Sequence, residues 1–123
     1  FQTMALARTD LSPVVQVGRA STVGVVTVGS AQTCYIKSIM VHNLDRDNLQ
    51  NCNIYVVPNN SGNVGSISST NKIARIGVGT DDTFFFEPNY PIVLTKNNDT
   101  LQVGNEGYTD NSLNVLVTGD IEI

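Results

Sequence analysis

The segment TCYIKSIMVHNL, residues 33–44, is the longest run in the chain that is rich in β-branched and aromatic residues. These residue types fit the pleated, half-buried surface of a β-strand, and neither Gly nor Pro interrupts the segment. Strand side chains alternate between two faces, and here Ile36 and Met40 share one face while Ile39 and Val41 share the other. The alternation therefore predicts a strand with both faces at least partly covered.

Eight further β-rich runs flank this segment, and helical periodicity is almost absent from the chain. They cover residues 14–17, 22–28, 53–57, 73–78, 82–87, 91–94, 100–103 and 113–118. Clusters of Gly, Pro, Asn and Asp, which tolerate turn dihedrals, separate them. Eight or nine short strands spaced about ten residues apart, with no crossover helices between them, predict an all-β fold, an antiparallel β-sandwich of the jelly-roll type.

The length of 123 residues suits one domain with one hydrophobic core. Residues 1–3 resemble the remnant of a cleaved expression tag ahead of Met4. Residues 4–12 precede Pro13 and lack a helix cap, and we expect an N-terminal arm there, either disordered or added as a strand to a neighbouring subunit's sheet. Residues 13–123 then form a single β-sandwich domain.

Charge is sparse in this chain. Only 15% of the residues are charged, the net charge is -4, and the seven Lys and Arg are scattered singly. Binding to a phosphate backbone needs clustered basic residues, so nucleic acid is not an expected partner. No apolar run approaches the roughly 20 residues that span a bilayer, and no signal peptide opens the chain. We therefore expect a soluble protein that is made in the cytoplasm and has no membrane partner.

Three consecutive phenylalanines, Phe84, Phe85 and Phe86, occupy one predicted strand. Because successive strand side chains point to opposite faces, the three rings cannot all enter one core. If Phe84 and Phe86 face the core, Phe85 points outward, where either a neighbouring subunit or a loop of the same chain covers it. Our interface hypothesis consists of these three residues and Tyr90, which lies beyond the following turn.

The chain offers little for catalysis. His42 is the only histidine, so a Ser-His-Asp or Cys-His arrangement would have to use it. It falls in the middle of a predicted strand, and Cys34 lies on the same predicted face about 26 Å away by strand rise. Nucleophile-elbow, phosphate-loop and dinucleotide motifs are missing. We expect a structural role for His42, no catalytic residue, no cofactor and no enzymatic activity.

Cys34 and Cys52 match neither a CxxC pair nor a metal-ligand spacing. We expect both to be reduced and structural, and a disulfide between them is the alternative.

A calcium site is the one metal hypothesis that the acidic residues allow. Asp45 opens a stretch like an EF-hand loop, but Gln50 stands where that loop needs Gly and Val56 stands where it needs Glu. An irregular site built from Asp45, Asp47 or the pair at 81–82 is the alternative to solvated turns. We expect no bound metal.

Several segments together resemble small virion structural proteins of tailed bacteriophages, in particular those of marine and cyanobacterial phages. The resemblance rests on the order of strand and turn signatures at residues 35–43, 54–59, 82–88, 98–101 and 113–122. It implies a β-sandwich or jelly-roll domain, assembly as a homo-oligomer such as a trimer, and a place in the virion on the capsid, neck or tail. The resemblance implies no catalytic residues. Unlike the longer fibre proteins, the chain has no collagen-like or coiled-coil shaft.

The sequence thus predicts a non-catalytic virion protein, made in a bacterial host, that acts as a capsid decoration or cement protein or as a neck or tail accessory. Its expected partners are copies of itself and phage capsid or tail proteins. The alternative is a module that binds carbohydrate or another host receptor through its loops. The absence of Trp argues against a sugar-binding platform without removing this alternative.

Overall fold

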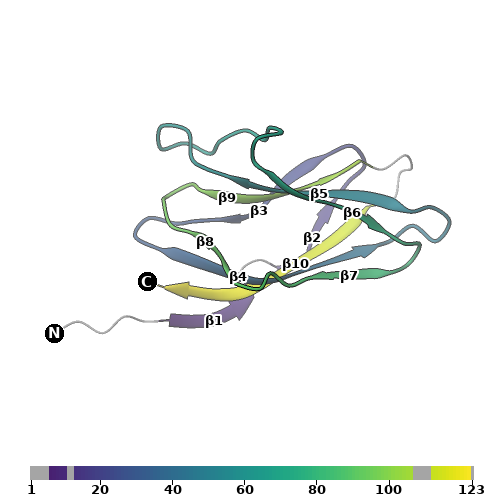
Figure 1. The fold of residues 1–123 in the computed structure, drawn as a ribbon, viewed down its shortest axis with the longest axis horizontal. Helices are drawn as coiled ribbons and strands as arrows, with labels where there is room; N and C mark the ends of the chain where they lie inside the picture. The colour runs from purple at the N-terminus through teal and green to yellow at the C-terminus, as the bar shows by residue number, and fades with distance from the viewer. Residues whose placement is uncertain (1–5, 11–12, 107–111, 123) are drawn as a thin grey trace.

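The computed structural model describes residues 6–10, 13–106 and 112–122. Over these residues the chain forms ten β-strands and no helix. Two antiparallel sheets lie one above the other, so the molecule is a β-sandwich (Figure 1). The predicted fold class is confirmed, and each of the nine predicted strand segments contains a strand.

The strands are short, as their turn-rich surroundings predict. In chain order they are β1 Leu6–Asp10, β2 Val15–Val17, β3 Thr22–Thr27, β4 Thr33–Asn43, β5 Gln50–Val57, β6 Lys72–Val78, β7 Thr83–Phe86, β8 Ile92–Leu94, β9 Thr100–Asn105 and β10 Leu113–Glu122.

Sheet A has the order β1-β10-β4-β7, with β2 also paired to β10 and β8 also paired to β4. Sheet B has the order β3-β9-β5-β6. If β7 and β8 are taken as one interrupted strand, β2-β10-β4-β7/β8 faces β3-β9-β5-β6, which is the two-sheet arrangement of a jelly roll.

The core lies between the two sheets and is built largely from β-branched residues and leucine. Its largest buried side chains include Ile36 and Ile39 from sheet A and Ile54 and Leu101 from sheet B. Burying one such side chain stabilises the fold by about 1.5–3 kcal/mol. Because both sheets supply these residues, the sandwich is held together by a single apolar layer.

A β-bulge in β4 explains why residues 33–44 carry large apolar side chains on both of their predicted faces. Thr118 of β10 pairs with Ser38 and Gly119 pairs with Ile36, so Lys37 is an extra residue without a partner in the register. The buried positions accordingly change from Cys34 and Ile36 before the bulge to Ile39, Val41 and Asn43 after it. The predicted common face of Cys34 and His42 is therefore wrong, because the bulge places them on opposite faces.

Sheet B contains two further bulges. Val25 of β3 is skipped in the pairing with β9, and Ile73 of β6 is skipped in the pairing with β5. The first explains why two consecutive residues, Val25 and Val26, are both buried. A strict alternation of faces does not allow this pattern.

The predicted N-terminal arm contains a strand. β1 pairs along its whole length with β10 of the same chain, from Leu6 opposite Glu122 to Asp10 opposite Thr118. It forms one edge of sheet A, while the expected tag remnant at residues 1–3 lies outside the described residues.

The long connection between β5 and β6, residues 58–71, is tied to the outer face of sheet B. Gln102 donates a hydrogen bond to the Gly65 carbonyl oxygen over 3.2 Å. A Cβ atom at Gly65 would lie 2.5 Å from the Pro58 carbonyl oxygen, so this close approach of two backbone segments needs glycine. In the part of the chain that the structure describes, there is no helix long and apolar enough to cross a membrane.

Candidate functional site

An apolar row crosses the outer face of sheet A. Met40 of β4 is paired with Phe85 of β7 on one side and with Leu116 of β10 on the other. Directly opposite residues of antiparallel strands share a face. Their neighbours Ile39 and Val41 are fully buried between the sheets, so the row points away from the core. Phe85, which is 59% exposed, therefore presents its ring to solvent.

A shallow apolar hollow lies beside this row and has a volume of about 200 Å³. It is smaller than the ~300 Å³ lower limit of typical small-molecule sites, so it fits a single side chain better than a ligand. Val14, which is 61% exposed, forms part of its wall. The lining residues are Val14, Met40, His42, Thr83, Asn114, Val115 and Leu116.

The four residues of the predicted interface lie in different surroundings. Phe85 points outward, whereas Phe84 and Phe86, opposite the buried Val41 and Ile39, are on the core side of β7. Phe86 packs against the core, and Phe84 is 37% exposed at the open edge of the sandwich. Tyr90 is 84% exposed in the segment between β7 and β8. Contact of these residues with another subunit stays a prediction.

His42 joins a hydroxyl and a carboxylate on the rim of the hollow. Its Nδ1 lies 2.8 Å from Thr83 Oγ1 and its Nε2 lies 3.5 Å from Asp81 Oδ1. A catalytic triad depends on a buried carboxylate that fixes the imidazole, but the Asp81 side chain is 61% exposed. The trio therefore lacks the water-excluded environment that makes such a group reactive. Its evident effect is to fix the loop before β7 against β4.

This interpretation can be tested with a chromogenic ester. The protein should release p-nitrophenol from p-nitrophenyl acetate no faster than its Thr83→Val variant does, because an imidazole whose carboxylate partner is exposed to water does not activate the Thr83 hydroxyl. Release is followed spectrophotometrically at pH 7 to 9. A turnover that disappears in Thr83→Val but persists in the loop control Asn97→Ala would contradict the prediction.

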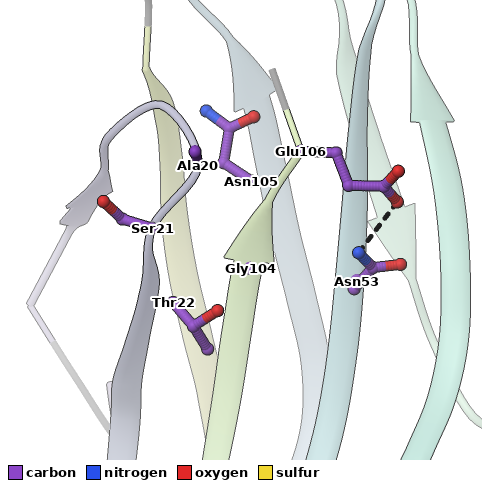
Figure 2. A pocket seen from close by; sticks show the side chains of 7 residues that line it. All are labelled: Ala20, Ser21, Thr22, Asn53, Gly104, Asn105 and Glu106. Atoms are coloured by element: carbon purple, nitrogen blue, oxygen red, sulfur yellow. Dashed lines mark hydrogen bonds between the residues drawn. The ribbon is translucent and has the colours of Figure 1, made fainter. Parts of the chain in front are cut away.

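A second depression, of about 370 Å³, lies at one end of sheet B (Figure 2). The turn between β2 and β3 forms one wall, and the end of β9 and part of β5 form the others. Its lining residues are Ala20, Ser21, Thr22, Asn53, Gly104, Asn105 and Glu106. Gly104 leaves room next to Thr22, because a Cβ atom there would lie only 3.0 Å from the Thr22 hydroxyl oxygen.

The Glu106 carboxylate, which lines this depression, already accepts hydrogen bonds from two side chains. Arg75 donates to Glu106 through Nε at 2.8 Å and through its Nη2 at 3.1 Å, and Asn53 donates over 2.8 Å, a contact that Figure 2 shows as a dashed line. The hydrogen bonds from Arg75, helped by the one from Asn53, lower the pKa of Glu106. Glu106 is thus ionised and paired, which does not suit a proton donor near neutral pH.

The acidic stretch after β4 is an ordered turn. Asp45 is almost fully buried, and its Oδ1 accepts hydrogen bonds from the backbone N–H groups of Asp47 at 2.8 Å and Asn48 at 3.1 Å. Its Oδ2 accepts from the Gln50 amide at 3.3 Å. Among the described residues, no three His, Cys, Asp or Glu side chains come close enough together to hold a metal ion. The turn is accounted for by hydrogen bonds within the protein.

Cys34 and Cys52 are free thiols buried in the core. They belong to different sheets, since Cys34 lies in β4 and Cys52 in β5. The predicted reduced state agrees with this structure. Burial raises the pKa of Cys34, and burial together with the Glu106 charge raises the pKa of Cys52 to about 12.

Both thiols should therefore be unreactive in the native protein. At pH 8 the thiolate, which is the nucleophile, is scarcely populated and inaccessible. We expect no reaction with Ellman's reagent before unfolding and two thiols per chain in guanidinium chloride. Fast labelling of one thiol under native conditions would show that the sandwich opens more easily than this packing allows.

No protein-family model and no curated protein matches the chain. A solved viral structure does share its fold. A chain of the T13 viral particle of IBDV superposes with a TM-score of 0.53 and 10% identity over 98% of this chain and 31% of that chain. A chain of the infectious bursal disease virus Gx strain gives a TM-score of 0.44 and 12% identity over 99% of this chain and 33% of that chain. The chain spans about a third of the length of these viral chains, and its likeness to the chain of the T13 particle is one of fold.

Proposed function

We propose that the protein is a non-catalytic structural component of a virus particle and that it acts by packing against other subunits through the outer face of sheet A. The observation that carries this proposal is the apolar row of Leu116, Met40 and Phe85 on that face. Phe85 is exposed and Met40 and Leu116 are half-buried beside it, and such a group of apolar side chains on an outer face often marks a protein–protein contact. The His42 ring and the carboxylates of Asp45 and Glu106 already have hydrogen-bond partners within the chain.

The virion setting rests on two independent supports. The strand and turn signatures resemble those of tailed-phage virion proteins, and the jelly-roll fold is shared over almost the full chain with part of a viral-particle chain. Within a phage, we propose a capsid decoration or cement protein, or a neck or tail accessory. Synthesis in the cytoplasm of the bacterial host belongs to the same proposal. Fold alone does not assign function, so the particle itself must be examined.

Particles of the phage that carries the gene provide the test. Gradient-purified virions should contain the protein at a fixed copy number by quantitative mass spectrometry, and recombinant protein should bind particles that lack it. Phe85→Asp should bind less than Ile73→Asp, which introduces the same charge at an exposed isoleucine of sheet B. Absence of the protein from purified particles would overturn the virion role.

A receptor-binding module is the second candidate, and the depression in Figure 2 favours it. Hydroxyl, amide and carboxylate groups line it, and the buried Asn53 Oδ1 atom has no hydrogen-bond partner among the described residues. Such groups are suited to sugar hydroxyls. A glycan array with and without calcium would show selective binding that is lost in Thr22→Val, and a silent array would remove this candidate.

A further inference from the structure

The outer face of sheet A carries a protruding ring and a hollow side by side. Phe85 stands out from β7, and its cross-strand partner Met40 forms part of the hollow that Val14 and Leu116 also line. The ring and the hollow therefore belong to the same face, one or two strands apart. A surface that contains both a projection and a recess of similar size is complementary to a copy of itself.

We propose that two copies of this chain pair face to face through sheet A, each seating its Phe85 in the hollow of the other. A two-fold axis that lies in the plane of contact, midway between ring and hollow, satisfies both contacts at once, as in an isologous interface. A ring of three copies needs the projection and the recess on different sides of the molecule. This pairing rests on the proposed function, because it specifies that the subunit packed against the outer face of sheet A is a second copy of this chain.

The face is large enough for such a contact. Strands lie about 4.8 Å apart and rise about 3.3 Å per residue, so the 36 strand residues of sheet A offer roughly 570 Å². Standard protein–protein interfaces bury about 800 Å² per partner. Residues outside the strands, such as the exposed Tyr90 next to β8, add to this area. A second copy of this chain thus meets a surface close to the size that a stable pair needs.

The neighbouring edge of sheet A argues for contact through the face and against strand addition. β7 and β8 are separate strands, and Pro88 and Pro91 lie in the connection between them. Proline lacks the N–H group that a further strand would need, and it is a known protection of sheet edges. A partner near Phe85 therefore approaches the face.

The charges on this face allow a like surface to approach. Lys37 Nζ lies 2.6 Å from Asp120 Oδ2, and the Tyr35 hydroxyl donates to Glu122 over 3.3 Å. Beside the hollow, Asp81 lies next to His42. Lys37 compensates the charge of Asp120. The carboxylates of Glu122 and Asp81 lie near opposite ends of β4, so few like charges meet at the centre of two paired faces.

Engineered cysteines test the geometry directly. Val14 and Phe85 are both exposed, so V14C and F85C should fold, and the buried Cys34 and Cys52 should not interfere. Under mild oxidation and at high protein concentration, an equimolar mixture of the two single variants should give a mixed disulfide dimer, because the mixed pair keeps the Phe85 ring of the V14C copy seated in the hollow of the F85C copy. The V14C/F85C double variant should close into a covalent dimer. A ladder of covalent oligomers, or no cross-link in the mixture, would overturn the pairing.

Solution measurements separate this inference from the proposed function. Sedimentation equilibrium should show a dimer that Phe85→Asp weakens by at least about 30-fold, as loss of a central aromatic anchor does, while Ile73→Asp leaves it unchanged. A stable trimer would overturn the two-fold pairing and leave self-association intact. A strict monomer at high micromolar concentration would overturn the pairing, whereas the presence of the protein in purified virions would still support the virion role.

Discussion

Replacement of Asn43 by alanine should lower the free energy of unfolding by about 3 kcal/mol, because it leaves several buried backbone groups without partners. The Asn43 amide donates toward the carbonyl oxygens of Asn48 at 3.0 Å, Val78 at 3.1 Å and Gly79 at 3.1 Å. Its Oδ1 accepts from the Asp45 N–H over 2.8 Å. One fully buried side chain thus joins two loops at the end of the sandwich.

Thermal and urea unfolding of Asn43→Ala measure this effect, and the melting temperature should fall by on the order of 10 °C for a domain of this size. Asn97→Ala is the matched control, since Asn97 is exposed in the turn before β9, and its effect should stay within about 0.5 kcal/mol. Asn43→Asp should be no better than alanine, because a carboxylate would face the three carbonyl oxygens. Equal stabilities of Asn43→Ala and Asn97→Ala would show that the loops are held by other contacts.

Ile54→Ala should cost about 2–5 kcal/mol, the range found when a large aliphatic side chain is removed from a packed core. Ile54 is fully buried, and on sheet B it lies between Ala74 of β6 and Val103 of β9. Its side chain belongs to the apolar layer that joins the two sheets. Loss of three carbon atoms there leaves a cavity that the surrounding β-sheet cannot readily close.

Ile73→Ala provides the control on the same sheet, because Ile73 is 46% exposed at the bulge of β6. Its effect should stay within about 0.5 kcal/mol. Urea unfolding should show a lower midpoint for Ile54→Ala with an unchanged slope, which indicates lost stability without a change in the surface exposed. A small effect at Ile54 would contradict the single, well-packed core described here.

Much of the fold follows from local sequence. Turn clusters separate the strands, and the alternation of Leu113, Val115 and Val117 in β10 fixes which of its faces meets the core. The pairing of strands could not be read in this way, because it depends on contacts between distant segments. β1 was predicted only as an arm, since residues 4–12 carry no clear alternation. Its place beside β10 is set by the partner strand.

The alternation of side chains along a strand does not predict where the bulges lie. Lys37, Val25 and Ile73 are ordinary strand residues, and nothing in their chemistry indicates that they are skipped in the register. The two-sided pattern of residues 33–44 predicted coverage on both faces. It arises because the inward face changes at Lys37, so most of the large aliphatic side chains point inward on both sides of the bulge.

The candidate site was predictable in part. Three consecutive phenylalanines imply that at least one ring leaves the core, and Phe85 does so. The hollow was missed, because Val14 before β2, Met40 of β4 and Leu116 of β10 are distant in sequence. The contact of His42 with Thr83 and Asp81 was missed for the same reason, since it depends on the pairing of β4 with β7.

The bulge at Lys37 also bears on how this lineage can vary in length. Loss of one residue elsewhere in β4 would turn every following side chain to the opposite face and expose half of the core. Loss of the extra residue at the bulge restores a regular ladder and leaves Ile36, Ile39 and Val41 facing inward. Descendants of this gene that are one codon shorter in β4 should therefore have lost it at this point, with the β-sandwich intact.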